Sequence, residues 1–182
     1  MRTQRRLRAD AQHNHDLLLE LAAQAFAREG TQTSLKAIAR AAGVGIGTLY
    51  RRFPTREALV EAVYRNEVAR LCDAAPELVA TLPPAEALRA WMERFVDFMA
   101  AKNGMGETLR ALLVSEDDRL ATRDLLRGAI ATLLDAGGVR AGVEPGDVLM
   151  GLGGITLIAG EEDRRELATR LIDLLLYGIT SR

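Results

Sequence analysis

Three alternating glycines, Gly43, Gly45 and Gly47, are the residues whose spacing most clearly suggests chemistry, and they open the stretch GVGIGTLYRRFP. Closely spaced glycines let backbone amides wrap a nucleotide phosphate, and they also form the tight turn before a helix that reads DNA. A phosphate-binding loop follows a buried strand, whereas these glycines follow the amphipathic segment LKAIARAAG. Their spacing is neither G-x-G-x-x-G nor a loop ending in Gly-Lys-Ser/Thr, so the sequence favours a DNA-reading turn.

The segments on both sides of this turn have the pattern of a helix-turn-helix unit, whose second helix enters the major groove. A helix of about two turns is predicted before Gly43, with Thr33 or Ser34 as its N-cap. Gly43 can adopt the left-handed conformation that reverses the chain. Leu49 and Phe53, four residues apart, then anchor the second helix on the core. The other face presents groups suited to phosphates and base edges, namely Gly45, Ile46, Gly47, Thr48, Tyr50, Arg51 and Arg52.

The elements around this unit have helical spacing of their apolar residues. Helices are predicted over residues 16–30, from Thr55 towards Pro76, and at about 88–104, 109–113, 117–137 and 145–160, followed by a last helix that contains residues 167–179. The acidic residues Glu161, Glu162 and Asp163 favour the N-terminus of the last helix. No run alternates with period two for long enough to predict a strand. The sequence therefore predicts an all-α fold.

The charge of the chain divides into two parts of opposite sign, although the net charge is -1. Residues 1–60 contain nine Arg and one Lys against five acidic residues, whereas residues 61–182 contain 14 basic and 20 acidic residues. A cationic N-terminal part attracts polyanions, and an acidic remainder limits indiscriminate binding to them. This distribution favours a nucleic acid as the partner of the N-terminal part.

Several classes of site are disfavoured by the residue counts. The only cysteine is Cys72, which leaves no intramolecular disulfide or Cys-based metal site and fits a reducing compartment. His13 and His15 are the only histidines, and we predict neither a metal site nor a cofactor. The N-terminus lacks the apolar segment of a secretory signal, and the most apolar stretch, DVLMGLGGITLIAG, is shorter than a membrane span. We therefore expect a cytoplasmic protein without a membrane partner.

The segment LKAIARAAGVGIGTLYRRFPTREALVEAV, residues 35–63, resembles the DNA-binding segment of the TetR/AcrR family of bacterial transcriptional regulators. The shared features are a helix, an Ala-Gly-Val turn, Gly-Thr-Leu-Tyr, and Phe-Pro with a basic residue before Glu-x-Leu, all in register. The likeness extends over about residues 10–65. It implies a three-helix helix-turn-helix domain with an N-terminal arm (residues 1–55) and a helical effector-binding and dimerisation domain (residues 56–182).

The same resemblance implies which residues face DNA. They are Thr33 at the start of the second helix, Gly45, Ile46, Thr48, Tyr50 and Arg52 in the recognition helix, and Arg56 at the start of the next helix. Tyr50 and Arg56 are expected to hold phosphates, and Arg51 is an adjacent basic candidate. Gly45 and Ile46 replace the hydroxyl and basic residues that members often carry, which reduces base readout.

Each of these positions also has a structural alternative. Ile46 could belong to the core stripe, and Arg51 and Arg52 could form an ordinary solvated face. The Arg-rich segment RTQRRLR could be a solvated end or an arm that contacts DNA.

One recognition helix reads too few bases for tight specific binding, so a homodimer that places two such helices about 34 Å apart is expected. The last two predicted helices are apolar enough to require cover. The family uses a four-helix contact there, which implies as interface residues Leu152, Ile155, Leu171, Leu174 and Leu175. The alternative is that both helices pack inside one subunit.

Large apolar side chains gather in the middle helices, where family members enclose a small, often hydrophobic effector. The candidate pocket residues are Trp91, Phe95, Phe98, Met99, Leu112, Leu126 and Ile130. The resemblance implies that an effector bound there shifts the helix that follows the recognition helix and releases the operator in double-stranded DNA. The predicted function is therefore a ligand-responsive repressor and not an enzyme. The alternative is a helical carrier or enzyme that does not bind DNA, although the sequence shows no catalytic constellation.

Overall fold

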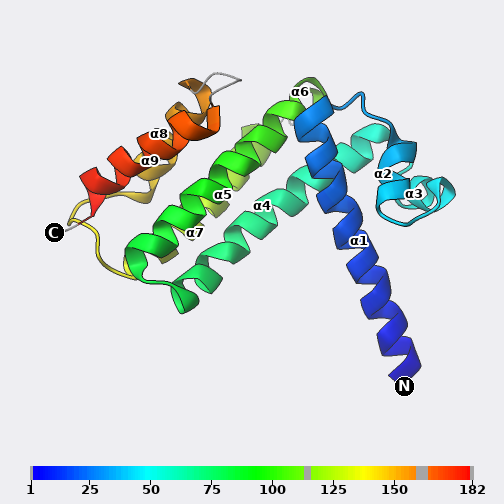
Figure 1. Ribbon diagram of the computed structural model, residues 1–182, viewed down its shortest axis with the longest axis horizontal. Coiled ribbons are helices and arrows are strands. Elements are labelled where there is room, and N and C mark those ends of the chain that lie inside the picture. Colours follow the sequence, from blue (N-terminus) through cyan, green and yellow to red (C-terminus); the bar gives the residue numbers. More distant parts are fainter. Residues whose placement is uncertain (1, 113–115, 159–163, 181–182) are drawn as a thin grey trace. The chain divides into compact units, whose positions relative to one another are not determined.

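The computed structural model describes residues 2–112, 116–158 and 164–180, and this part of the chain is built of helices joined by short loops (Figure 1). The helices are α1 (Arg2–Glu29), α2 (Leu35–Ala41), α3 (Ile46–Arg52), α4 (Arg56–Thr81), α5 (Pro84–Gly104), α6 (Gly106–Leu112), α7 (Glu116–Asp135), α8 (Pro145–Ile158) and α9 (Arg164–Ile179). The one pairing of extended backbone found among the described residues is an isolated antiparallel bridge between Val139 and Thr180. The predicted all-α fold is confirmed.

The chain forms two compact units. The first unit consists of Met1–Glu67 together with Ala100–Val114, and the second of Val68–Met99 together with Ser115–Arg182. Long helices α4 and α5 therefore contribute residues to both units. The domain boundary predicted between residues 55 and 56 falls inside the first unit, because the first turns of α4 belong to it and bury Leu59, Val60 and Val63.

Helix α1 begins at Arg2, far earlier than residue 16, where the sequence predicted its start. The Arg-rich segment that the sequence suggested as an arm thus forms the first turns of this helix. Neither Gly nor Pro interrupts residues 2–29, and Arg, Leu, Ala and Gln are good helix formers. The later turns bury Leu18, Ala22 and Phe26, so tertiary packing fixes the C-terminal part of α1 in the first unit.

Helix α4 continues through Pro76 to Thr81. Proline has no backbone N–H, so the Cys72 carbonyl loses its usual helical donor at this point. The helix nevertheless continues because the residues around the proline, Ala75 and Leu78 among them, are buried in the second unit. The C-terminal turn is closed by the Thr81 hydroxyl, which donates to the Glu77 carbonyl at 2.8 Å.

The core of the second unit is centred on Trp91 of α5. This side chain is fully buried, and its indole N–H donates to the Leu71 carbonyl of α4 at 2.8 Å. Phe95 stacks on it with a ring-centroid separation of 5.9 Å. Helix α7 packs against α8, and α8 packs against α9. At the end of α9, the Arg140 amide donates to the Ile179 carbonyl at 2.8 Å, which fixes the α7–α8 loop beside the C-terminal turn.

The acidic residues predicted at the N-terminus of the last helix, Glu161, Glu162 and Asp163, lie outside the described residues. Across residues 2–112, 116–158 and 164–180, no helix combines the length and apolar character needed to cross a membrane.

Candidate nucleic-acid interface

Helix α2 forms the first half of a helix-turn-helix unit. The Ser34 side chain is the N-cap, since its hydroxyl oxygen accepts from the Ala37 amide at 3.3 Å. Leu35, Ile38 and Ala39 are buried and hold the helix on the core. These contacts confirm the predicted helix of two turns and its cap.

The turn after α2 depends on Gly43. This residue has a φ of +68°, in the left-handed region, and its amide donates to the Arg40 carbonyl at 3.1 Å. The Val44 amide then donates to the Ala39 carbonyl at 2.9 Å, which completes the end of α2. The chain is thereby reversed and α3 begins two residues later, as the sequence predicted.

Alanine at position 43 is expected to lower the free energy of unfolding by about 1 kcal/mol, because a Cβ is disfavoured at a left-handed φ. No atom lies within 4 Å of the Cβ that alanine would add there, so the effect isolates backbone strain. Gly47→Ala is the matched control, because position 47 is equally open and lies inside α3. It is expected to raise stability by roughly 0.5–1 kcal/mol through helix propensity. Urea unfolding followed by circular dichroism measures both, and equal effects would contradict the strain argument.

Helix α3 is anchored by one side and exposed on the other. Leu49 is fully buried and Phe53, its C-cap residue, is nearly so. Ile46 is 37% exposed and Tyr50 is 48% exposed, so Ile46 does not join the core stripe. We call the exposed set the α3 face; it consists of Gly45, Ile46, Gly47, Thr48, Tyr50, Arg51 and Arg52.

The α3 face carries its polar groups close together. The Arg51 guanidinium donates to the Thr48 hydroxyl at 3.2 Å, one helical turn away. Arg51 and Arg52 lie in the last turn of α3, and both are exposed. Two guanidinium groups, a phenol and a hydroxyl on one short helix can donate to phosphates and to acceptors on base edges.

Thr33 and Arg56, for which the resemblance implied a DNA contact, both make hydrogen bonds within the first unit. The Thr33 side chain is buried, and its hydroxyl donates to the Glu29 carboxylate. The half-buried Arg56 donates through Nη1 to the Thr33 carbonyl at 2.8 Å and to the Thr31 carbonyl. These carbonyls lie in the loop between α1 and α2, where no helical amide pairs with them, so a nearby cation satisfies them. Both residues therefore stabilise the loop that leads from α1 into the helix-turn-helix unit.

Sequence reasoning missed a second support, at the corner between α5 and α6. Gly104 lies so close to α1 that a Cβ added to it would be 2.0 Å from the Phe26 carbonyl oxygen. The Thr108 hydroxyl of α6 donates to the Thr31 hydroxyl at 3.1 Å. The Asn103-Gly104 pair was interpreted only as a helix end. The approach of Gly104 to Phe26, which is far away in the sequence, leaves no local signal.

His15 of α1 links the long helix to the recognition helix. Its ring stacks on Phe53 with centroids 5.9 Å apart, and its buried Nδ1 atom has no hydrogen-bond partner in the described structure. Burial, followed by the positive charge of Arg52, lowers the pKa of His15 from 6.5, while Asp16 acts in the opposite direction. His15 is therefore a packing residue that disfavours its own protonation.

Acidification is expected to destabilise the first unit through His15. Because the folded-state pKa is lowered, the unfolded chain binds more protons as the pH falls below 6.5, and stability is lost from that pH downward. His15→Leu should flatten the stability profile between about pH 5 and pH 7. Arg52→Gln should make the loss smaller, because removing the second cause brings the folded-state pKa of His15 closer to 6.5. Urea unfolding at each pH tests this, and a wild-type profile in His15→Leu would contradict it.

Most of the predicted effector residues lie in the core of the second unit, and Met99 is half-buried there. Trp91, Phe95, Phe98, Leu126 and Ile130 are all buried in the second unit. Leu112 belongs to the first unit, so the structure does not group it with the others.

A cavity of about 360 Å³ lies elsewhere in the second unit, lined by Glu93, Val96, Arg165, Glu166, Ala168, Thr169 and Ile172. None of the predicted pocket residues lines it. At 100° per residue, Glu93 and Val96 project from the side of α5 opposite Trp91 and Phe95.

The predicted dimer residues divide between the interior and the surface. Leu152 is fully buried inside its own subunit, which corrects its assignment to an interface. Leu175 is half-buried and contacts α8 at Gly151, and Leu174 is 67% exposed. Ile155 and Leu171 are half-buried. Two further large apolar residues, Met150 and Leu157 of α8, are exposed and were missed by sequence reasoning. We call Met150, Leu157, Leu174 and Tyr177 the α8–α9 apolar face.

Comparisons with known proteins agree with this architecture. Residues 18–63, which include α2, the turn and α3, match the family described as bacterial regulatory proteins, tetR family. Residues 83–181 match the family described as transcriptional regulator SbtR-like, C-terminal domain. Together the two matches cover the helix-turn-helix unit and the C-terminal helices, which is more than half of the chain.

Solved structures of transcriptional regulators are similar over nearly the full length. The crystal structure of a TetR transcriptional regulator from Streptomyces coelicolor has 48% sequence identity and a TM-score of 0.80, with 91% of this chain and 97% of that chain covered. A TetR transcription regulatory protein from Mycobacterium vanbaalenii has 33% identity and a TM-score of 0.73, with 96% and 99% covered. These matches, together with the exposed α3 face, show that the chain belongs to the TetR family of bacterial transcriptional regulators.

Proposed function

We propose that this protein is a ligand-responsive repressor that binds a palindromic operator as a homodimer through the α3 face. The observation that carries the proposal is the orientation of α3. Leu49 and Phe53 fix the helix from within, so Thr48, Tyr50 and Arg52 point outward together. Tyr50 and the two arginines would bind phosphates, and the Thr48 hydroxyl and Ile46 would reach base edges and thymine methyl groups.

The α8–α9 apolar face supports the homodimer. Leu157 is 86% exposed and Leu174 is 67% exposed, and such side chains on one pair of helices mark an interaction surface. A second copy of the same face would cover them in a two-fold arrangement, since an isologous interface is self-complementary. Two α3 helices would then contact successive major grooves.

Placing carboxylates in this face is expected to convert the dimer into monomers. In Leu157→Glu with Leu174→Glu, association would require burial of charged groups, which is unfavourable by several kcal/mol. Light scattering with size-exclusion chromatography measures the mass directly. Leu125→Glu is the matched control, because Leu125 is an exposed leucine of α7 outside the face. A double variant that keeps the dimeric mass would exclude this surface as the interface.

We infer that the second unit binds a small, predominantly apolar effector and that binding lowers the affinity for DNA. Supporting this are the match of residues 83–181 to a regulator C-terminal domain and the large apolar core around Trp91. Binding among these side chains would require them to move apart, which would favour one arrangement of the helices over another. An effector with different affinities for the two arrangements shifts the population between them.

The decisive experiment is to select genomic fragments with the pure full-length protein and to sequence those that are retained. We expect a palindrome with half-sites about one helical turn apart, as a two-fold dimer requires. Affinity for this DNA should fall steeply as salt rises, because each phosphate contact releases counterions. Absence of any DNA retention at low salt would sink the proposal and favour a helical carrier.

A further inference from the structure

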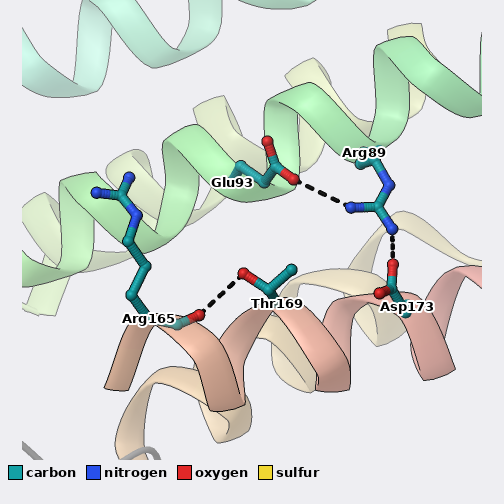
Figure 2. A network of polar contacts seen from close by, with 5 residues as sticks. All are labelled: Arg89, Glu93, Arg165, Thr169 and Asp173. Carbon is teal, nitrogen blue, oxygen red and sulfur yellow. Dashed lines mark hydrogen bonds and ion pairs between the residues drawn. The ribbon is translucent and has the colours of Figure 1, made fainter. Parts of the chain in front are cut away.

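Helices α5 and α9 of the second unit run antiparallel and are joined by two ion pairs. Arg89 of α5 pairs with Asp173 of α9 (Figure 2). Arg165 Nη2 of α9 lies 2.6 Å from Asp97 Oδ1 of α5. The two pairs are separated by eight residues on each helix, which is slightly more than two turns. Glu93 lies midway between them on α5, as Thr169 does on α9 (Figure 2).

A cavity of about 360 Å³ lies along this seam, and we call it the α5–α9 groove. Its floor is apolar and consists of Val96, Ala168 and Ile172, all of which are buried. Its rim is polar and consists of Glu93, Arg165, Glu166 and Thr169. This volume suits a small organic molecule, and the combination of floor and rim suits one with an apolar part and a polar end.

Among the described side chains that form ion pairs beside the groove, four carboxylates share three guanidinium groups. Arg89 donates through Nη1 to Glu93 at 3.1 Å and through Nη2 to Asp173, so one guanidinium is shared by two carboxylates. The second rim carboxylate, Glu166, lies 3.9 Å from Arg170, which is beyond hydrogen-bond distance. The rim therefore has residual negative charge and unused capacity to accept hydrogen bonds.

The donors of the rim are already engaged. The Arg165 side chain extends from α9 towards α5 (Figure 2), where its guanidinium donates to Asp97. The Thr169 hydroxyl donates its single hydrogen to the Arg165 carbonyl at 2.9 Å, and its oxygen can still accept. A ligand end that itself donates several hydrogen bonds fits this rim better than one that accepts them.

We propose that the α5–α9 groove binds a small organic amine, with its ammonium among Glu93, Glu166 and the Thr169 hydroxyl oxygen and its apolar part on the floor. An ammonium group has three N–H donors and a positive charge, which matches three acceptors and the surplus of carboxylate. A ligand carboxylate would face two glutamates and an arginine that is already paired. A neutral alcohol has one donor and no charge. The proposal does not depend on DNA binding.

The test uses the full-length protein with 2-phenylethylamine as the probe and 2-phenylethanol and 3-phenylpropanoate as its neutral and anionic counterparts. Titration calorimetry and ligand-observed NMR at neutral pH and low salt should show binding of the amine alone. Glu93→Gln should weaken amine binding about tenfold, because a charge-assisted hydrogen bond is lost. Thr169→Val should weaken it several-fold. Glu86→Gln is the matched control, since Glu86 is an exposed residue of α5 that does not line the groove.

Three results would overturn the proposal: no amine binding up to millimolar concentration, equal binding of all three compounds, or unchanged amine affinity in Glu93→Gln. Preferred binding of the acid, lost in Arg165→Gln, would overturn it in favour of an anion site. Circular dichroism of each variant checks the fold, and Glu166→Gln replaces Glu93→Gln if the latter is unfolded. DNA affinity is measured in parallel. Loss of DNA binding would contradict only the repressor proposal, and loss of amine binding would contradict only the amine site.

Discussion

Replacing Gly104 by alanine is expected to lower the free energy of unfolding of the first unit by about 3 kcal/mol or more, the upper range for an overpacked site. The added Cβ would lie 2.0 Å from the Phe26 carbonyl oxygen and 2.6 Å from the Phe26 carbonyl carbon. Both are backbone atoms of α1, so no side-chain rotation relieves the contact. The end of α5 must move away from α1, which also loosens the fully buried Met105.

Gly128→Ala provides the control for this substitution. Gly128 lies within α7, and an added Cβ there meets no atom within 4 Å. Alanine should therefore raise stability by roughly 0.5–1 kcal/mol through helix propensity alone. Urea unfolding followed by circular dichroism gives both values. Wild-type stability in Gly104→Ala would show that α1 and the α5–α6 corner do not approach as closely as described.

The double variant Tyr50→Ala with Arg52→Ala is expected to lose about a hundredfold in affinity for the selected operator. Both side chains are exposed on the α3 face and neither supports the core, so the fold should be unaffected. Each subunit of a dimer loses one cation, and the slope of log affinity against log salt should therefore fall by about 2. Fluorescence anisotropy with a labelled operator at several salt concentrations measures both quantities.

Arg28→Ala separates this local effect from a general loss of charge. Arg28 is an exposed residue in the last turn of α1, outside the α3 face, and its removal changes the net charge by the same amount as that of Arg52. Its affinity for the operator should remain within about threefold of wild type. If Arg28→Ala and the double variant weaken binding equally, the α3 face is not the DNA-binding surface.

The recognition helix was predictable from sequence because its determinants are local. Leu49 and Phe53 are four residues apart, so one face of a helix must carry both, and the structure buries both. Gly43 occurs at the end of an amphipathic pattern, where a left-handed residue ends a helix, and its φ is positive. Ser34 precedes the pattern and caps it.

The determinants that sequence reasoning missed are tertiary. Helix α8 is apolar on all sides, so the pattern could not separate buried Leu152 from exposed Leu157. A glycine at a helix end has the same sequence signature whether or not another helix approaches it, which is why the contact of Gly104 was not predicted. The aromatic residues of α5 predict a buried face equally well for a packed core and for an effector pocket, and the structure shows a packed core.

The first unit is assembled from two stretches that are far apart in the sequence, Met1–Glu67 and Ala100–Val114, so it cannot be completed early in translation. The recognition helix leaves the ribosome long before Met105 and Thr108, which belong to the second stretch. Closing the long intervening loop costs chain entropy and slows folding relative to local helix formation. The DNA-reading part of the protein should therefore reach its final form only after translation has passed α6, and until then its apolar face is a natural substrate for chaperones.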